Sequence, residues 1–340
     1  MKRILLSLAA CLLPIALLAL VFIHWRHSRG VVLSFWSAAF SRDGQTLLTT
    51  SGQDALADPP RLGELAAWEL AKGKKHRLVW QPCGIRAVVQ SSDGKFVALG
   101  DFSGATKLVH PVTGKLLAVL PPHSTLVSAV AISADNTLIA SGSMDGTVSF
   151  GDTAGKELGM LVLPGEKVLN VAVSPNGRLL VATTLRGSAY LYDLVRNDEP
   201  QALLAYEGPP MESPEAKGAA FAPDGLSLAT GCQRTVRLWD SLSSRMIRQL
   251  EGATCPVNSV AFSPDGTTLA AVDSEGTLRL WGTALGEQIN EAPAHRGSSS
   301  CVVFTPDGRR LATVGRDDLT VKLWDAQTLA LVRTLNARAR

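Results

Sequence analysis

The sequence predicts an all-β chain: one seven-bladed β-propeller of four-stranded antiparallel blades, preceded by one N-terminal transmembrane helix. Three observations predict it: an apolar run near the N-terminus, a four-residue turn motif that recurs seven times, and a spacing between these motifs that suits one blade. We therefore expect a signal anchor and its flank over residues 1–30, a propeller over 31–336 and a basic tail over 337–340.

The anchor is predicted from residues 4–23, which are uncharged and mostly apolar. At about 1.5 Å of rise per residue, a helix of this length matches the roughly 30 Å hydrocarbon core of a bilayer. Lys2 and Arg3 precede the run, and Arg26 follows it. The run ends through bulky residues such as Phe22 rather than through a small-x-small cleavage site, which favours a retained signal anchor over a cleaved signal peptide.

Three alternatives for this segment stay open. Residues 8–11, which end in Cys11, resemble a bacterial lipobox, and a cleaved signal or a buried core helix would also be apolar. The charges flanking the run give little indication of how the anchor is oriented in the membrane, because Lys2 and Arg3 on one side are balanced by Arg26 and Arg29 on the other. We expect the propeller outside the cytoplasm, as is common when one large domain follows an N-terminal anchor.

The turn motif marks one β-hairpin in each repeat. Asp-Gly or Asn-Gly between two β-rich runs is a strong hairpin signal, because glycine accepts positive φ and Asp or Asn bonds its own turn backbone. The seven copies, which include one Asp-Asn variant, occupy residues 41–44, 91–94, 133–136, 174–177, 222–225, 263–266 and 305–308. With the exception of Gln90, an apolar residue stands three positions before each turn Asp or Asn, and another stands four positions after it. This shared register is what packing successive sheets face to face requires.

The spacing of the turns selects the propeller. Successive turn Asp or Asn residues are 50, 42, 41, 48, 41 and 42 residues apart, and a four-stranded blade takes about 40–45 residues. After each hairpin we expect a third strand, such as residues 235–240 or 320–325, and then an outer strand, such as 116–120, 246–250 or 329–335.

These repeats resemble the WD-repeat family of β-propellers. Trp239-Asp240 and Trp324-Asp325 match the Trp-Asp dipeptide that ends the third strand, and the other repeats carry degenerate versions. In that family a His, a strand Ser or Thr, a turn Asp and the Trp form a hydrogen-bonded structural tetrad within a blade. The resemblance assigns this tetrad to His295, Thr313, Asp318 and Trp324 in blade seven, and a partial version to His123, Ser141 and Asp145 in blade three.

The phase of the repeats also predicts how the ring closes. The first recognisable strand, 33–40, occupies an inner position, and the last, 329–335, occupies an outer one. Each blade is then one contiguous stretch, and blades one and seven should meet mainly by face packing. A strand from residues 26–32 paired beside Trp324 would contradict this.

Composition and motifs argue against nucleic-acid binding, metal binding and the common catalytic sites. The chain is 46% hydrophobic and 19% charged, with 33 basic and 30 acidic residues, so it lacks the concentrated basic stripe of a nucleic-acid binder. Its five cysteines (Cys11, Cys83, Cys232, Cys255 and Cys301) form no C-x-x-C pair, which suggests neither a zinc site nor a disulfide framework. We find no phosphate-loop, dinucleotide, zinc-protease or nucleophile-elbow motif and expect neither a cofactor nor a metal.

Two functions remain under consideration. The first is a membrane-tethered, non-catalytic interaction scaffold, monomeric as a propeller, that presents one face to a protein or peptide. The alternative is a propeller hydrolase or oxidoreductase that uses the central channel, which would require converging His, Asp or Glu on the inner strands, and no such set is recognisable in the sequence. For the scaffold, two long connections are the candidate partner-binding loops, because loops on a rigid scaffold are favoured recognition sites. Their residues are Asp54, Asp58 and Arg61 in the first loop and Tyr206, Glu207, Met211, Glu212 and Glu215 in the second.

Overall fold

The structure, a computed structural model, describes residues 34–52, 62–196, 199–203 and 215–336. No helix among these residues is long and apolar enough to cross a membrane. The anchor predicted over residues 4–23 and the basic tail over 337–340 lie outside the described residues.

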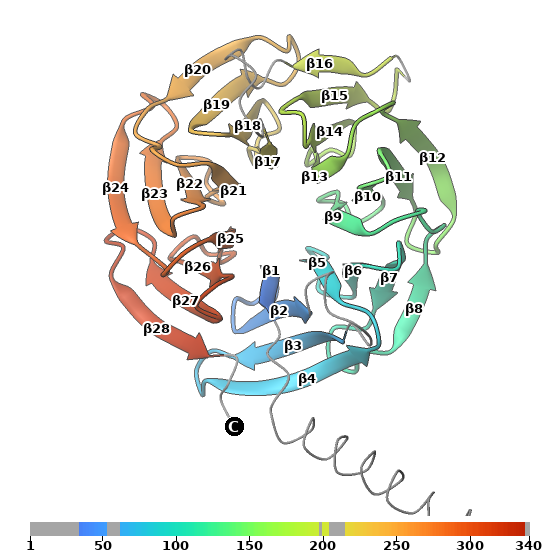
Figure 1. Ribbon diagram of the computed structural model, residues 1–340, viewed down its shortest axis with the longest axis horizontal. Coiled ribbons are helices and arrows are strands. Elements are labelled where there is room, and N and C mark those ends of the chain that lie inside the picture. Colours follow the sequence, from blue (N-terminus) through green and yellow to red (C-terminus); the bar gives the residue numbers. More distant parts are fainter. Residues whose placement is uncertain (1–33, 53–61, 197–198, 204–214, 337–340) are drawn as a thin grey trace, which may run out of the picture. The chain divides into compact units, whose positions relative to one another are not determined.

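The described residues form seven four-stranded antiparallel sheets, each built from four consecutive strands (Figure 1). Blade one contains β1 (Ser34–Phe40), β2 (Thr46–Gly52), β3 (Gly63–Glu69) and β4 (Lys74–Gln81). Blade two contains β5 (Ile85–Gln90), β6 (Val97–Asp101), β7 (Thr106–Val109) and β8 (Leu116–Val119). Blade three contains β9 (Val127–Ile132), β10 (Ile139–Ser143), β11 (Thr147–Gly151) and β12 (Glu157–Val162).

The remaining four blades repeat this order. Blade four contains β13 (Val168–Val173), β14 (Leu179–Thr184), β15 (Ala189–Asp193) and β16 (Gln201–Leu203). Blade five contains β17 (Ala216–Phe221), β18 (Ser227–Cys232), β19 (Thr235–Asp240) and β20 (Met246–Leu250). Blade six contains β21 (Val257–Phe262), β22 (Thr268–Asp273), β23 (Thr277–Gly282) and β24 (Gln288–Pro293). Blade seven contains β25 (Ser299–Phe304), β26 (Arg310–Gly315), β27 (Thr320–Asp325) and β28 (Leu331–Asn336).

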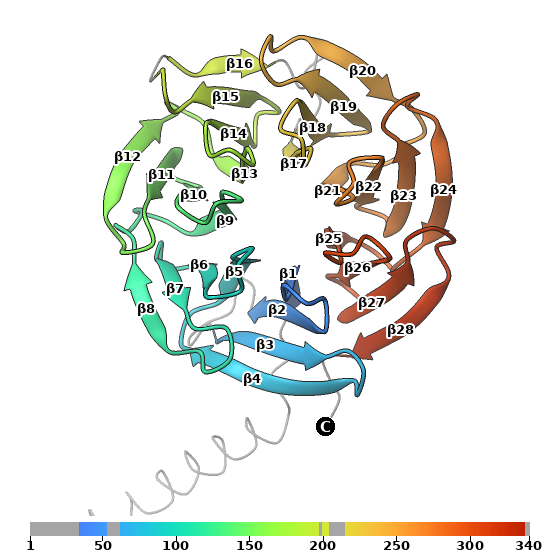
Figure 2. The same ribbon diagram turned by 180° about the vertical axis from the view of Figure 1, so that it is seen from behind.

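This architecture confirms the predicted seven-bladed propeller. In Figures 1 and 2 the first strand of every blade faces the central channel and the fourth strand lies on the circumference. Two predicted outer strands differ at their ends: the strand predicted over 116–120 ends at Val119, and the strand predicted over 329–335 runs from Leu331 to Asn336. Leu329 has a φ of 54° and donates its N–H to the carbonyl of Asp325, so it belongs to the turn that precedes the strand.

The apolar core is a ring of seven clusters, each shared by two neighbouring blades. The cluster between blades five and six, for example, joins Val236 and Leu238 to Val260, Leu269 and Trp281. Because both faces of each middle strand are covered, residues that alternate along a strand contribute to two different clusters. The regular apolar register of the seven repeats is therefore what closes each interface.

The ring closes by the face packing that the repeat phase predicts. Phe35, Phe40 and Leu47 of blade one pack with Val321 and Leu323 of blade seven in one cluster of the same kind as the others. In the described residues the outermost strand of blade seven is β28, which is contiguous with β27. Residues 26–32, whose pairing beside Trp324 would contradict this closure, lie outside the described residues.

The hairpin turns form a second ring of contacts. Gly44 has a φ of 66°, and a Cβ placed on it would lie 3.5 Å from Pro306 Cδ in blade seven. The same distance separates a Cβ placed on Gly266 from Pro223 Cδ of the preceding blade. The Pro and Gly of the motif thus serve two purposes, because they shape each turn and also pack it against the next one.

Candidate functional site

The four residues of the predicted tetrad lie in one chain of hydrogen bonds within blade seven. Trp324 Nε1 donates to Thr313 Oγ1 at 2.9 Å, and Thr313 Oγ1 lies 2.8 Å from His295 Nε2. His295 Nδ1 lies 3.0 Å from Asp318 Oδ2. Burial lowers the pKa of His295, so the ring is neutral near pH 7. We therefore assign the ring proton to Nδ1, which donates to Asp318, while Nε2 accepts from the Thr313 hydroxyl.

Blade three has the partial arrangement that the sequence predicts. His123 Nε2 lies 2.9 Å from Ser141 Oγ, and His123 Nδ1 lies 3.9 Å from Asp145 Oδ1. Gly151 stands where the Trp would be, and a Cβ placed on it would lie 3.2 Å from Leu120 Cδ2. Leu120 at the end of blade two therefore covers part of the place that an indole occupies in blade seven.

Blades two and six each contain an ion pair with a buried carboxylate, which was not predicted from the sequence. In blade six, Arg279 Nη1 donates to Asp273 Oδ2 at 2.7 Å, and both side chains are buried. In blade two, Lys107 Nζ donates to Asp101 Oδ2 at 2.8 Å, and Gln81 also bonds to both residues. In each pair the acidic residue ends the second strand of the blade and the basic residue lies in the third. Both pairs therefore share one sequence pattern, an Asp-x-x-Gly turn followed three residues later by Lys or Arg, which could have indicated the ion pair.

The turn carboxylates on the hairpin side are already bonded to their own turns. Asp265 Oδ1, for example, accepts from the backbone N–H of Thr267 at 3.0 Å. Hydrogen bonds of this kind, first from the N–H of Lys95, lower the pKa of Asp93 to about 2. The same geometry recurs at other turns, which supports the structural role that the sequence suggests for turn Asp residues.

Most of the predicted partner-binding residues lie outside the described residues. These are Asp54, Asp58 and Arg61 in the first loop and Tyr206, Glu207, Met211 and Glu212 in the second. Glu215 is described, and its carboxylate forms an ion pair with the ammonium group of Lys217. The two loops connect β2 to β3 and β16 to β17, whose joined ends lie at the end of the blades where the inner strands begin.

At that same end, a β-bulge in every blade turns one side chain toward the central channel. The pairing of the first two strands skips one residue near the start of each inner strand. A bulge adds one residue to a strand and changes where its side chain points. The seven skipped residues all line one cavity of about 210 Å³: Trp36, Arg86, Ser128, Leu169, Lys217, Asn258 and Ser300. We call this cavity the channel mouth.

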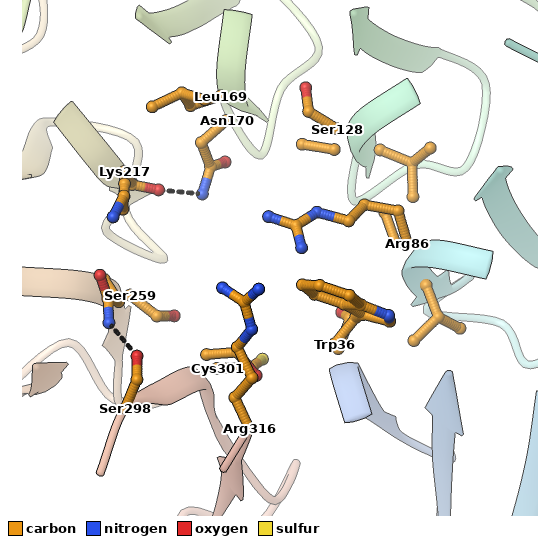
Figure 3. A pocket seen from close by; sticks show the side chains of 17 residues that line it. Trp36, Arg86, Ser128, Leu169, Asn170, Lys217, Ser259, Ser298, Cys301 and Arg316 are labelled. Carbon is orange, nitrogen blue, oxygen red and sulfur yellow. Dashed lines mark hydrogen bonds between the residues drawn. The ribbon is translucent and has the colours of Figure 1, made fainter. Parts of the chain in front are cut away.

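The cationic part of the channel mouth is built around one indole ring. The Cζ atom of Arg86 lies 4.2 Å from the Trp36 ring centroid, and that of Arg316 lies 4.6 Å from it. Figure 3 shows both guanidinium groups extending into the same space, from blades two and seven on either side of blade one. The Trp36 ring also packs edge-on against Phe102, at a centroid distance of 6.1 Å.

The lining of the channel mouth is basic and polar, with no carboxylate among its 17 residues (Figure 3). Lys217, on the far side from Trp36, is paired with Glu215 just outside the lining. Three lining atoms are buried without a hydrogen-bond partner in the described chain: Trp36 Nε1, Asn258 Oδ1 and Ser300 Oγ. Trp36 thus differs from Trp68, Trp239, Trp281 and Trp324, whose indole N–H groups all donate to the protein. The channel mouth therefore combines cationic side chains with buried polar atoms.

A regular signal in the sequence marks the seven bulged residues. Each stands seven positions before the turn Asp or Asn of its blade, so that Trp36 precedes Asp43 as Arg86 precedes Asp93. Strict alternation along a strand gives no reason to group these positions, because the bulge breaks the period. A site of converging His, Asp or Glu side chains does not include Trp36, Arg86, Lys217 or Arg316, so the sequence did not predict these as site residues.

Among the described residues, no group of three or more His, Cys, Asp or Glu side chains could hold a metal ion. The four described cysteines are free thiols, and burial raises the pKa of Cys232 to about 11. Cys301 lines the channel, and its burial also raises the pKa of its thiol. These thiols are therefore protonated near neutral pH, where they are poor nucleophiles.

Four stretches of the chain match the WD domain, G-beta repeat family: residues 114–150, 212–240, 244–282 and 286–325. The match over 244–282 begins at the outer strand of blade five and ends with the third strand of blade six. One sequence repeat therefore spans two adjacent blades.

Several curated proteins resemble this chain. Pre-mRNA-processing factor 19 homolog 2 of Arabidopsis thaliana is 29% identical over 53% of this chain and 34% of its own length. Periodic tryptophan protein 2 of the same plant is 26% identical over 64% of this chain and 24% of its own length. Ribosome biogenesis protein YTM1 of Vanderwaltozyma polyspora is 27% identical over 66% of this chain and 52% of its own length. The chain thus spans between about a quarter and a half of the length of these relatives.

Proposed function

Because this chain is a seven-bladed β-propeller with WD repeats, we propose that it is a non-catalytic protein-interaction scaffold that presents its channel-mouth face to a protein or peptide partner. The observation that carries the proposal is the channel mouth itself, where bulged side chains from all seven blades converge. Its charged groups are guanidinium and ammonium groups on rigid strands, which suit binding rather than proton transfer.

The two long connections support the same face. Both connections leave from strand ends at the end of the blades where the channel mouth lies. Loops carried on a rigid scaffold are common recognition elements. Shortening either loop to a Gly-Ser turn should therefore weaken partner capture without lowering the melting temperature.

A matched pair of substitutions tests the proposed face. Leu169→Trp adds bulk at the channel mouth, whereas Leu226→Trp makes the same change at an exposed hairpin turn on the opposite end. Each full-length variant is crosslinked in intact cells, extracted in mild detergent and analysed by mass spectrometry. We expect partners captured by the parent and by Leu226→Trp to be lost from Leu169→Trp. Equal capture by all three proteins would contradict the proposed face.

We further propose that residues 4–23 tether a monomeric propeller to a membrane, with the propeller outside the cytoplasm. The support is the length and apolarity of this run. Alkaline carbonate should then leave the full chain in the membrane pellet, and protease added to intact cells should degrade the propeller. A mature chain that begins after residue 11 would replace the retained anchor with a processed signal.

A further inference from the structure

A second candidate surface lies on the circumference of blade one, along its outer strand β4 (Figure 1). This strand has eight residues, whereas the outer strands of the other blades have three to six. Within the described residues no strand pairs with the outward edge of β4, because β4 is the last strand of its sheet. Such an edge directs backbone N–H and C=O groups outward, where they can pair with a strand of another chain. We call this surface the β4 edge.

The β4 edge carries an exposed tryptophan. Trp80 is 44% exposed, whereas the other described tryptophans are at most 6% exposed. The pairing of β3 with β4 skips Leu78, and this extra residue brings the side chains of Arg77 and Trp80 to the same face of the sheet. The Cζ atom of Arg77 lies 4.3 Å from the Trp80 ring centroid. Tryptophan and arginine are enriched among the residues that contribute most to protein–protein binding, so this pair is suited to anchor a partner.

The charge of the β4 edge indicates the chemistry of that partner. The hairpin of β3 and β4, residues 63–81, contains two carboxylates and four Lys or Arg side chains: Glu64 and Glu69, and Lys72, Lys74, Lys75 and Arg77. Both Lys75 and Arg77 pair with the single carboxylate of Glu64, at 2.8 and 3.2 Å. Positive charge therefore exceeds negative charge on this hairpin. A second copy of the same edge would be repelled, whereas an acidic strand would be attracted.

We propose that the β4 edge binds an extended acidic segment of a partner protein, which adds to blade one as a fifth strand. The backbone of the segment pairs with β4, its carboxylates lie beside the basic side chains, and an apolar side chain packs against Trp80. An anionic lipid surface has the same charge but offers no backbone to a strand edge, so the edge favours a peptide. The inference goes beyond the channel-mouth proposal, because neither Arg77 nor Trp80 lines that cavity.

The test uses the full-length chain in mild detergent. Fluorescein-Gly-Thr-Glu-Thr-Glu-Thr-Val-Thr-amide is the probe, and fluorescence anisotropy measures its affinity. One counterpart has Gln in place of both Glu residues. Another is N-methylated at two adjacent peptide bonds, which keeps both carboxylates but prevents an unbroken ladder of backbone hydrogen bonds. Phosphatidylglycerol added to the detergent micelles is the lipid probe.

The ¹⁹F spectrum of the chain labelled with 5-fluorotryptophan locates the bound peptide. The chain has seven tryptophans, and Trp80→Phe assigns the Trp80 signal. The other six signals report whether a variant keeps its fold. We expect the Glu peptide to shift the Trp80 signal with saturation, and the Gln and N-methylated peptides to bind at least about tenfold more weakly.

Substitutions on β4 should weaken binding of the Glu peptide. Trp80→Ala should do so about tenfold or more, because truncating an anchoring tryptophan is among the costliest changes at an interface. Arg77→Gln should do so about fivefold, because it removes a charge-assisted hydrogen bond. Arg248→Gln, at an exposed position of outer strand β20, is the matched control and should change nothing. Leu169→Trp should also bind the peptide as the parent does, since it alters only the channel mouth.

Several results would overturn the inference. These are an unchanged Trp80 signal with the Glu peptide, equal binding of the Gln or the N-methylated peptide, and loss of peptide binding in Leu169→Trp. A Trp80 signal that responds to phosphatidylglycerol but to no peptide would replace the acidic strand with a lipid surface. The outcome is separate from that of the channel-mouth proposal, because partner capture at the mouth is tested by Leu169→Trp and peptide binding at β4 by Arg77→Gln.

Discussion

Replacing Thr313 by Val isolates the energetic role of the blade-seven tetrad. The change keeps the shape of the side chain and removes one hydroxyl. That hydroxyl accepts from Trp324 Nε1 and donates to His295 Nε2, so both ring nitrogens lose their partner at once. Thr313 is fully buried, and Trp324 and His295 are 5% and 6% exposed, so solvent does not replace the lost bonds.

The expected cost follows from these two orphaned groups. A buried polar group left without a partner costs about 1–3 kcal/mol. Two such groups cost about 4 kcal/mol, and the added methyl group offsets about 1 kcal/mol by its burial. We therefore expect Thr313→Val to lower the free energy of unfolding by about 3 kcal/mol, which for a chain of this size lowers the melting temperature by about 6 °C.

Blade five supplies the matched control. Thr230 accepts from Trp239 Nε1 at 2.8 Å and is equally buried, but among the described residues it bonds to no histidine. Thr230→Val orphans one group rather than two, so its expected cost is about 1 kcal/mol. Differential scanning calorimetry of the full-length parent and of both variants measures the difference.

A double-mutant cycle separates the hydrogen bond from general packing. Trp324→Phe removes the indole N–H, so in the Thr313→Val background it also removes one orphaned donor. We expect it to cost about 2 kcal/mol less there than in the parent. Equal costs in the two backgrounds, or equal destabilisation by Thr313→Val and Thr230→Val, would refute the tetrad reasoning.

Three further predictions concern stability. Burial lowers the pKa of His295 below its unfolded value of about 6.5. The contribution of neutral His295 to the free energy of unfolding is therefore fully present above that pH and falls by at most about 1.4 kcal/mol per pH unit below it. His295→Asn should flatten this dependence in thermal melts between pH 5 and 8. Arg279→Met leaves Asp273 buried and unpaired and should cost about 3–5 kcal/mol in denaturant titrations, whereas adding Asp273→Asn should recover most of the loss. Gly44→Ala, at a φ of 66°, should cost about 1–2 kcal/mol by calorimetry, and a smaller change than 0.5 kcal/mol would contradict the strain argument.

The sequence was sufficient to predict the blades because their signals are local. Each Asp-Gly or Asn-Gly turn acts through its own backbone bonds, as when Asp265 accepts the N–H of Thr267. The apolar residues at fixed offsets, such as Phe262 and Leu269, then define which faces pack. Even the contiguous build of blade seven followed from counting strands, because short turns connect neighbouring strands.

The ion pairs of blades two and six were harder to predict. Asp273 and Arg279 are close in sequence, but a turn Asp followed by a base is common on exposed hairpins and carries no sign of burial. In the folded chain Arg279 also donates to Thr254 Oγ1 and to Glu291 Oε2. These contacts come from outside the turn, so the Asp-x-x-Gly pattern alone does not predict that the pair is buried.

By itself, then, the sequence determined the number of blades, their order and their register, since hairpin chemistry and strand alternation act within about forty residues. The tertiary structure alone decided the channel mouth. Trp36, Arg86 and Arg316 meet only because a bulge redirects the first two and because ring closure brings blade seven beside blade one. Such convergence depends on the geometry of the whole ring, which no single repeat encodes.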